Sequence, residues 1–130
     1  MKAKNSSRTL EAVLQSTSET LFPAGMGKQE VKVESTDSDG DTALHVIAGR
    51  NDALGVELLI EAGAKIDAIG DMGETPLHSA LRNNALKSME VLLFNQARTD
   101  IKSEFGASAR GIAKEKGGQV EKTFRQYRRN

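Results

Sequence analysis

The fold is decided by a phrase that the sequence contains twice, "GDTALHVIAGR" at residues 40–50 and "GETPLHSALRN" at residues 73–83. The two copies begin 33 residues apart, and each has Thr, Leu and His at equivalent positions. The same offset aligns "VELLIEAGAKID" at 56–67 with "MEVLLFNQARTD" at 89–100. Self-similarity at a fixed period of this length indicates a structural unit that is repeated along the chain.

Each copy is predicted to form two short helices. Thr42 and Thr75 stand where an N-cap residue belongs, and Pro76 takes the first helical position, where its missing N–H is harmless. Apolar residues at helical spacing then predict second helices over about 53–62 and 86–96. The unit is therefore a helical hairpin.

A pair of short helices cannot bury its own apolar face, so neighbouring pairs are expected to stack and share one core. The period, the "TPLH" opening and the "LLIEAGA" close resemble those of the ankyrin repeat family, over about residues 37–125. The resemblance implies an all-α solenoid of helix–turn–helix units. It also implies β-turn or hairpin arms between the units and a capping helix at each end.

The third copy of the unit, at 104–118, departs from the pattern. Arg110 stands where the other copies have Leu, Gly111 replaces the histidine, and Gln96 replaces Gly63, the expected left-handed C-cap. Such departures are typical of a terminal capping unit, whose outer face meets water, or of an irregular third unit. We therefore divide the chain into an N-terminal helix with a loop and strand (1–36), repeat 1 (37–69), repeat 2 (70–102) and a degenerate capping repeat with a basic C-terminal helix (103–130).

Both ends of the chain are expected to carry elements that cover the stack. Residues 6–21 combine a Ser/Thr cap with apolar residues at helical spacing, which predicts one N-terminal helix. "EVKVE" at 30–34 alternates and predicts a short strand. Residues 117–130 place Phe124 and Tyr127 on one face with arginines outside it, which predicts an amphipathic helix.

The composition limits the classes of function. The 130 residues include 18 basic and 18 acidic side chains, a balance that gives no reason to expect nucleic acid or membrane as the main partner. Hydrophobic residues make up 38% and aromatic residues 4%, which suits a thin aliphatic core between helices. The absence of cysteine excludes disulfides and thiolate chemistry. The sequence has no signal-like or membrane-length apolar run, so we expect a cytoplasmic protein. We also expect a monomer with no cofactor and no small-molecule substrate.

The two histidines, His45 and His78, have two interpretations. As general bases or metal ligands, they would face a common groove. As structural residues, each ring would hydrogen-bond nearby backbone and the Thr hydroxyl of its own repeat. The resemblance implies the structural role, and neither a cysteine nor a third histidine is present to complete a metal set. We therefore predict that the phrase repeats because the structural unit repeats.

Two short motifs fail the spacing of the sites that they suggest. In "AGMGK" at 24–28, Phe22 stands where a phosphate-binding loop needs Gly, and Gln29 follows the lysine in place of Ser or Thr. "DSDGD" at 37–41 lacks the Gly and Glu that an EF-hand requires at its sixth and twelfth positions. Neither nucleotide nor calcium binding is predicted.

Recognition of a partner is expected at the arms and at the ends of the first helices, because those side chains are not needed for packing. Ile69, Met72 and Phe105 are apolar at predicted arm tips, which marks either an interface or side chains folded back on neighbouring arms. The arms are acidic, which steers a basic partner or simply discourages strand-to-strand aggregation. The predicted protein-binding residues are Ser38, Asp39, Asp41, Arg50, Ile69, Asp71, Met72, Glu74, Arg82, Asn83, Lys102, Glu104 and Phe105.

The leading hypothesis is a non-enzymatic protein-binding module that acts through the arm edge and the concave helix face. It would be a small adaptor, or an inhibitor that occupies a partner such as a basic nuclease toxin. The alternative is a hydrolase or transferase that uses His45 or His78 as a base on the same scaffold. A third hypothesis is RNA or membrane contact through "KTFRQYRRN" at 122–130.

Overall fold

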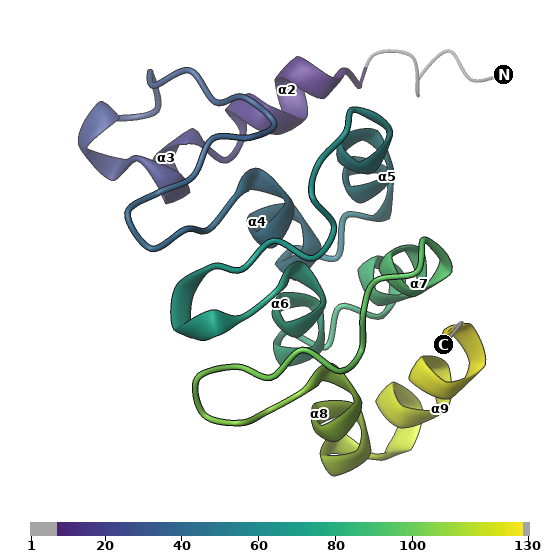
Figure 1. Cartoon of the computed structure of the whole chain (residues 1–130). Helices are drawn as coiled ribbons and strands as arrows, with labels where there is room; N and C mark the ends of the chain where they lie inside the picture. The colour runs from purple at the N-terminus through teal and green to yellow at the C-terminus, as the bar shows by residue number, and fades with distance from the viewer. Residues whose placement is uncertain (1–7, 129–130) are drawn as a thin grey trace, which may run out of the picture.

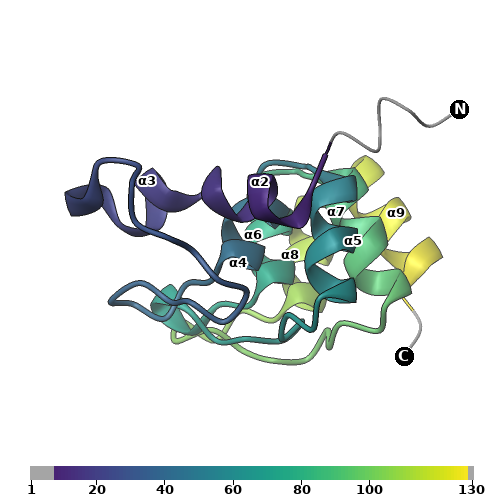
Figure 2. The same ribbon diagram turned by 90° about the horizontal axis from the view of Figure 1, so that it is seen from above.

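The computed structural model describes residues 8–128. Its helices form two columns of a stack, and the loops between successive pairs project from one side, as Figures 1 and 2 show. One column holds α4 (Ala43–Gly49), α6 (Pro76–Arg82) and α8 (Ala109–Lys116), and the other holds α5 (Ala53–Glu61), α7 (Leu86–Phe94) and α9 (Gly118–Tyr127). The N-terminal end carries α2 (Leu10–Gln15), α3 (Ser18–Leu21) and the 3-10 turn η1 (Pro23–Gly25), while η2 (Asp71–Gly73) lies in the second projecting loop.

Three of the projecting loops form the arms: the first at 36–42, the second at 69–75 and the third at 102–108. Isolated antiparallel bridges close the first and third arms at their ends. A 2.8 Å backbone hydrogen bond from Gly70 to Glu74 closes the second. The arms that the resemblance implied are thus present, as turns and single bridges.

The first helix of each repeat begins at a hydroxyl N-cap. Thr42 and Thr75 each accept a hydrogen bond from the backbone N–H three residues on, at 3.4 and 3.3 Å, and Ser108 does the same at 3.0 Å. Pro76 occupies the first turn of α6, where no backbone donor is required. The predicted caps are confirmed, and the cap persists in the third repeat although Gly111 takes the histidine position.

Each histidine ties its own repeat to the next arm. In His78, Nδ1 accepts from the backbone N–H of Thr75 at 3.0 Å, so the ring proton lies on Nε2, which donates to the carbonyl of Ala107 at 2.8 Å. His45 makes the equivalent bonds at 3.1 and 3.0 Å, the second to the carbonyl of Glu74. Both rings are buried. The predicted structural role of the histidines is confirmed.

One apolar core runs along the stack. α6 packs between α4 and α8, and α7 packs between α5 and α9, so each helix pair is covered by the next. Leu44 and Leu77 of the repeated phrase are fully buried, and Phe124 on α9 closes the core at the C-terminal end. Because the core is shared, no single repeat is expected to be stable alone.

The N-terminal helix predicted over 6–21 is confirmed only in part. The structure has two helices there, α2 and α3, and the first two residues of the prediction lie outside the described residues. The break falls at Ser16 and Thr17, whose hydroxyls donate to the carbonyls three residues earlier, both at 2.7 Å. Such side-chain bonds offer the backbone an alternative to a continued helix.

The strand predicted at 30–34 is also wrong, because this segment is an irregular loop. Its backbone turns where the N–H of Lys32 donates to the hydroxyl of Ser35 at 2.8 Å, and no strand lies beside it within residues 8–128. Val31 is buried nevertheless. The alternating pattern therefore arises because the valines of this loop point toward the core, and not because the segment is a strand of a sheet.

The amphipathic helix predicted at the C-terminus is confirmed as α9. Phe124 is buried, Val120 and Tyr127 are packed against the core, and Arg125 is exposed. Arg129 lies outside the described residues. Because α9 packs on both α7 and α8, the third repeat completes a helix pair despite its altered phrase.

We expect His78→Ala to lower the free energy of unfolding by about 2–4 kcal/mol, because it leaves the Thr75 N–H and the Ala107 carbonyl without their partners in a buried place. Urea unfolding followed by circular dichroism measures the loss. Ser108→Ala removes only a hydroxyl cap and should cost about 1 kcal/mol. Equal losses in the two variants would contradict the role assigned to the ring.

Arginines fasten the N-terminal segment to the first repeat. Arg8 makes two hydrogen bonds to the carboxylate of Asp52, at 3.1 and 2.6 Å. Arg50 donates to the hydroxyl and to the carbonyl of Ser16, at 3.0 and 3.1 Å. The bonds from Arg8, opposed by partial burial, hold the pKa of Asp52 below its ordinary value.

The lowered pKa of Asp52 predicts a pH-dependent contribution to stability. Because this pKa is lower in the folded than in the unfolded protein, the ion pair stabilises the fold at neutral pH, and its contribution is lost as the pH falls below about 4. Arg8→Gln should reduce the free energy of unfolding at pH 7 by no more than about 1 kcal/mol, since both side chains are partly exposed. Urea unfolding at neutral pH and at about pH 3 should show the difference shrinking in acid. A difference independent of pH would show that the ion pair is not its source.

Candidate protein-binding groove

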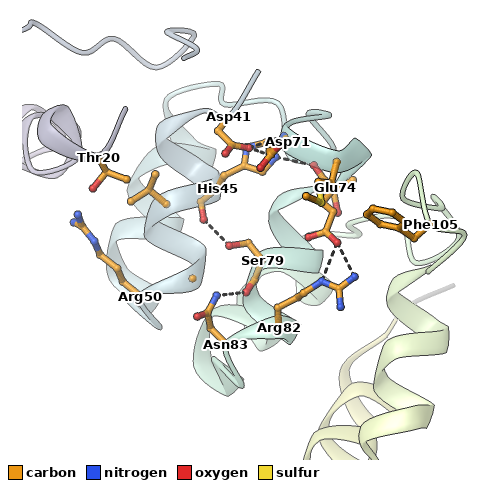
Figure 3. A pocket seen from close by; sticks show the side chains of 14 residues that line it. Thr20, Asp41, His45, Arg50, Asp71, Glu74, Ser79, Arg82, Asn83 and Phe105 are labelled. Atoms are coloured by element: carbon orange, nitrogen blue, oxygen red, sulfur yellow. Dashed lines mark hydrogen bonds and ion pairs between the residues drawn. The ribbon is translucent and has the colours of Figure 1, made fainter. Parts of the chain in front are cut away.

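A groove of about 770 Å³ lies between the arms and the first helices of the first two repeats. Figure 3 shows α4 and α6 forming one wall, with Ser79, Arg82 and Asn83 on α6 and its C-terminal end. The arms form the other wall, and Phe105 of the third arm lies at its edge. The remaining lining residues are Thr20, Asp41, His45, Val46, Gly49, Arg50, Asp71, Met72, Glu74 and Thr75.

Hydrogen bonds join the three arms into one wall. The backbone N–H of Asp71 donates to the carboxylate of Asp41 at 2.9 Å, which connects the second arm to the first. The N–H of Glu104 donates to the carbonyl of Met72 at 2.9 Å, which connects the third arm to the second. The tips of the arms are therefore held in fixed register along the groove.

The helical wall is also ordered by polar contacts, which Figure 3 marks with dashed lines. The hydroxyl of Ser79 donates to the carbonyl of His45 at 2.9 Å, and the amide of Asn83 donates to the carbonyl of Ser79 at 2.8 Å. Arg82 reaches Glu74 of the second arm, with Nε 2.8 Å and Nη2 2.6 Å from the same carboxylate oxygen. This pairing raises the pKa of Arg82. The ion pair connects the helical wall to the arms.

Two apolar side chains stand exposed on the groove. Met72 is 49% exposed and Phe105 is 74% exposed, so a large part of each side chain faces solvent on the groove. Met72 has a φ of 58°, a left-handed conformation that residues other than glycine rarely adopt. Ile69 is 54% exposed as well, but it lines a second groove of about 460 Å³ beside Val33 and Ala68.

The first groove brings together most of the residues that the sequence predicted for partner binding. Ile69 is separated from the other two apolar tips because it lies in the second groove. Ser38, Asp39, Lys102 and Glu104 line neither groove. The predicted residues that share the first groove are Asp41, Arg50, Asp71, Met72, Glu74, Arg82, Asn83 and Phe105.

Six lining residues were not predicted to bind a partner, and two of them, His45 and Thr75, were assigned structural roles instead. Val46 and Gly49 share a face of α4 with Arg50, and Ser79 is the counterpart of Val46 one repeat later. Helical spacing from the predicted Arg50 would have identified this face. Thr20 belongs to α3, and no signal in the sequence places that helix beside the groove.

The acidic side chains of the arms fall into two groups. Asp37 accepts two backbone hydrogen bonds within its own arm, at 2.9 and 3.0 Å, and Asp41 and Glu74 hold the bonds described above. These three carboxylates stabilise the fold. The exposed acidic side chains of the arms that form no ion pair with another described residue are Asp39, Asp71 and Glu104.

His45 lines the groove but is not poised as a base. Its Nδ1 and Nε2 are both engaged with backbone groups, and the carboxylate of Asp41 lies 4.0 Å from Nε2. His78 is engaged in the same way. The geometry therefore gives no support to the alternative in which either ring abstracts a proton from a substrate.

Stacked helix pairs with arms along one edge define a helical repeat protein. Residues 6–104, more than half of the chain, match the family described as "Ankyrin repeats (3 copies)". The chain belongs to the ankyrin repeat family, whose repeats are protein–protein interaction modules. A search of curated proteins found no match. No helix among residues 8–128 is long and apolar enough to cross a membrane.

The family match begins within the segment that we assigned to the N-terminal cap. Thr9 caps α2 by accepting from the N–H of Ala12 at 3.1 Å, and it lies 33 residues before Thr42, in register with the other caps. However, α2 packs chiefly on α5, whereas the first helices of the later repeats pack on one another. The segment shares the capping signal of the repeats but not their packing.

Gly73→Ala should destabilise the fold by about 2 kcal/mol, of which about 1 kcal/mol reflects the left-handed backbone at φ 73°. The rest reflects a new Cβ only 3.1 Å from the backbone nitrogen of Glu104, where the second and third arms meet. Gly106→Ala is the matched control, since its φ is 83° and nothing lies within 4 Å of its Cβ. It should cost only about 1 kcal/mol. Urea unfolding compares the two variants, and equal losses would mean that the contact between the arms is not tight.

Proposed function

We propose that this ankyrin repeat protein is a non-enzymatic module that binds a partner through the arm edge and the concave groove. The observation that carries the proposal is the exposure of Met72 and Phe105 on two arms that are hydrogen-bonded to each other. Both side chains line the groove, and neither belongs to the buried core. Exposed apolar side chains rimmed by charge are typical of the centres of interfaces.

The chemistry of the partner follows from the charges around these two side chains. Asp71 is adjacent to Met72 in the second arm, and Glu104 is adjacent to Phe105 in the third. Both carboxylates are exposed. A partner that presents basic groups beside an apolar side chain would be steered toward this edge and would complement it.

The mode of action that we propose is occupancy of the partner's surface. The protein would serve as a small adaptor, or as an inhibitor that neutralises a basic enzyme by covering it. We further propose that the protein is cytoplasmic and that it acts as a monomer. In a monomer, the arm edge of the chain is available to the partner. Nucleic acid is not the partner proposed for this edge, since the charge there is acidic.

Met72→Asp combined with Phe105→Asp should abolish partner binding, because the two apolar contacts are replaced by charges that must be desolvated. Affinity capture from a native lysate, with identification by mass spectrometry, defines the partner of the unmodified protein. Calorimetry with that purified partner should then show at least about a hundredfold weaker binding for the variant. Circular dichroism should show unchanged helicity.

Met26→Asp is the matched control for this experiment. Met26 is 72% exposed and has a φ of 53°, close to that of Met72, but it follows η1 and does not line the groove. The control should bind the partner normally. The proposal fails if the double variant binds as tightly as the unmodified protein, or if no partner binds with better than about micromolar affinity.

A further inference from the structure

The charges of the chain are segregated along the stack. Residues 8–105 contain nine basic and sixteen acidic side chains, a net charge of −7. Residues 106–128 contain six basic and two acidic side chains, a net charge of +4. α8 and α9, which make up most of the second stretch, lie at the end of the stack opposite α2 (Figure 1). The balanced charge of the whole chain therefore conceals a cationic end.

A groove of about 290 Å³ lies between α8 and α9 at this cationic end. Its lining includes Ala113 and Phe124, which are each only 1% exposed and give it an apolar floor. Glu121 is the acidic residue that lines it. The basic residues that line the groove are all exposed. They are Arg110 and Lys114 on α8, Arg125 on α9, and Arg128 directly after α9.

Part of this positive charge is not compensated within residues 8–128. Glu121 lies 3.9 Å from Arg125, at the limit of an ion pair. Arg110 donates to the hydroxyl of Thr99 at 3.2 Å, and its charge also acts on the nearby carboxylate of Asp100, whose pKa is lowered chiefly by the hydrogen bond from Arg98. No ion pair joins Lys114 or Arg128 to another residue in the part of the chain that the structure describes. The groove therefore presents an excess of positive charge over an apolar floor.

We propose that this groove binds an acidic helical segment of a partner protein. The site is separate from the arm groove, and its proposal does not depend on the function proposed for the arms. Opposite charge selects an acidic partner. Arg110 and Lys114 are one helical turn apart, and so are Arg125 and Arg128, a spacing that matches carboxylates one turn apart on a facing helix.

The position of the groove in the stack favours a helix as its occupant. α4 and α5 are covered by α6 and α7, which are covered in turn by α8 and α9. The groove between α8 and α9 is lined by exposed side chains over a buried floor, so a helix from another protein can pack there as the helix pairs pack on one another. The apolar floor would receive the apolar edge of such a helix, and the cations would flank it.

A nucleic acid fits this groove less well. Proteins that bind single strands stack the bases on exposed aromatic faces, whereas Phe124 is buried. A long polyanion would also meet the net charge of −7 carried by residues 8–105, whereas a short acidic helix would contact only the cationic end. RNA contact through 122–130 is therefore an alternative outcome of the test below.

The test uses the full chain and a capped synthetic peptide of alanine, leucine and glutamate, with glutamates one turn apart on one edge and leucines beside them. Amide chemical shifts should move at α8 and α9 and not at the arms. The affinity should fall as salt is added. Lys114→Gln combined with Arg125→Gln should weaken binding about fivefold or more, since two exposed charge contacts are lost.

Lys87→Gln combined with Lys122→Gln is the matched control, because it removes two exposed positive charges from α7 and α9 without altering the groove lining. It should change the affinity by less than about twofold. The proposal is overturned if shifts do not appear at α8 and α9, or if the control weakens binding as much as the groove variant. It is also overturned if an oligothymidylate of equal charge binds more tightly than the peptide. Sedimentation showing that the chain self-associates through Lys114 and Arg125 would overturn it in favour of a second copy.

Discussion

The stack depends on the pair of hydrogen bonds that each buried histidine makes. His78 accepts from the first turn of its own repeat and donates to the carbonyl of Ala107 in the next arm, and His45 does the same toward Glu74. Buried backbone groups must be paired, so the ring satisfies two of them with one side chain. Each imidazole bridges the start of one helix and the next arm, and so helps to fix the spacing between them. The wall of arms, and hence the groove beside it, exists because this spacing repeats.

In the groove, some of the lining side chains stabilise the fold, whereas others are available to contact a partner. Asp41 and Glu74 look like recognition residues in the sequence, yet in the structure they hold an arm and an arginine. The exposed large apolar side chains on the groove are Met72 and Phe105. Selectivity is therefore expected to reside in apolar contacts at the tips, with the remaining exposed carboxylates guiding approach.

Much of the fold could be predicted because its signals are local. A hydroxyl cap, Pro76 at a first turn and apolar residues at helical spacing each act within a turn or two of helix, and the period then copies them. The geometry even overrides residue type, since Gln96 adopts a φ of 68° where Gly63 has 96°. The exposed tips could be predicted for the same reason. The separation of Ile69 from Met72 could not, because it depends on how neighbouring arms pack.

By itself, the sequence determined the repeated unit, its caps, the structural role of the histidines and the amphipathic last helix. Only the tertiary structure decided that Arg8 pairs with Asp52 and that the carboxylate of Asp41 accepts a hydrogen bond from the second arm. It also decided that the side-chain oxygen of Asn51 accepts hydrogen bonds from the backbone N–H groups of Lys87 and Ser88 in the first turn of α7, at 2.8 and 3.2 Å. The side chain of the N-cap residue of α7 makes no such bond. The reason is physical: a cap or a period is encoded within a few residues, whereas these contacts join residues thirty or more positions apart, whose distance is set by packing.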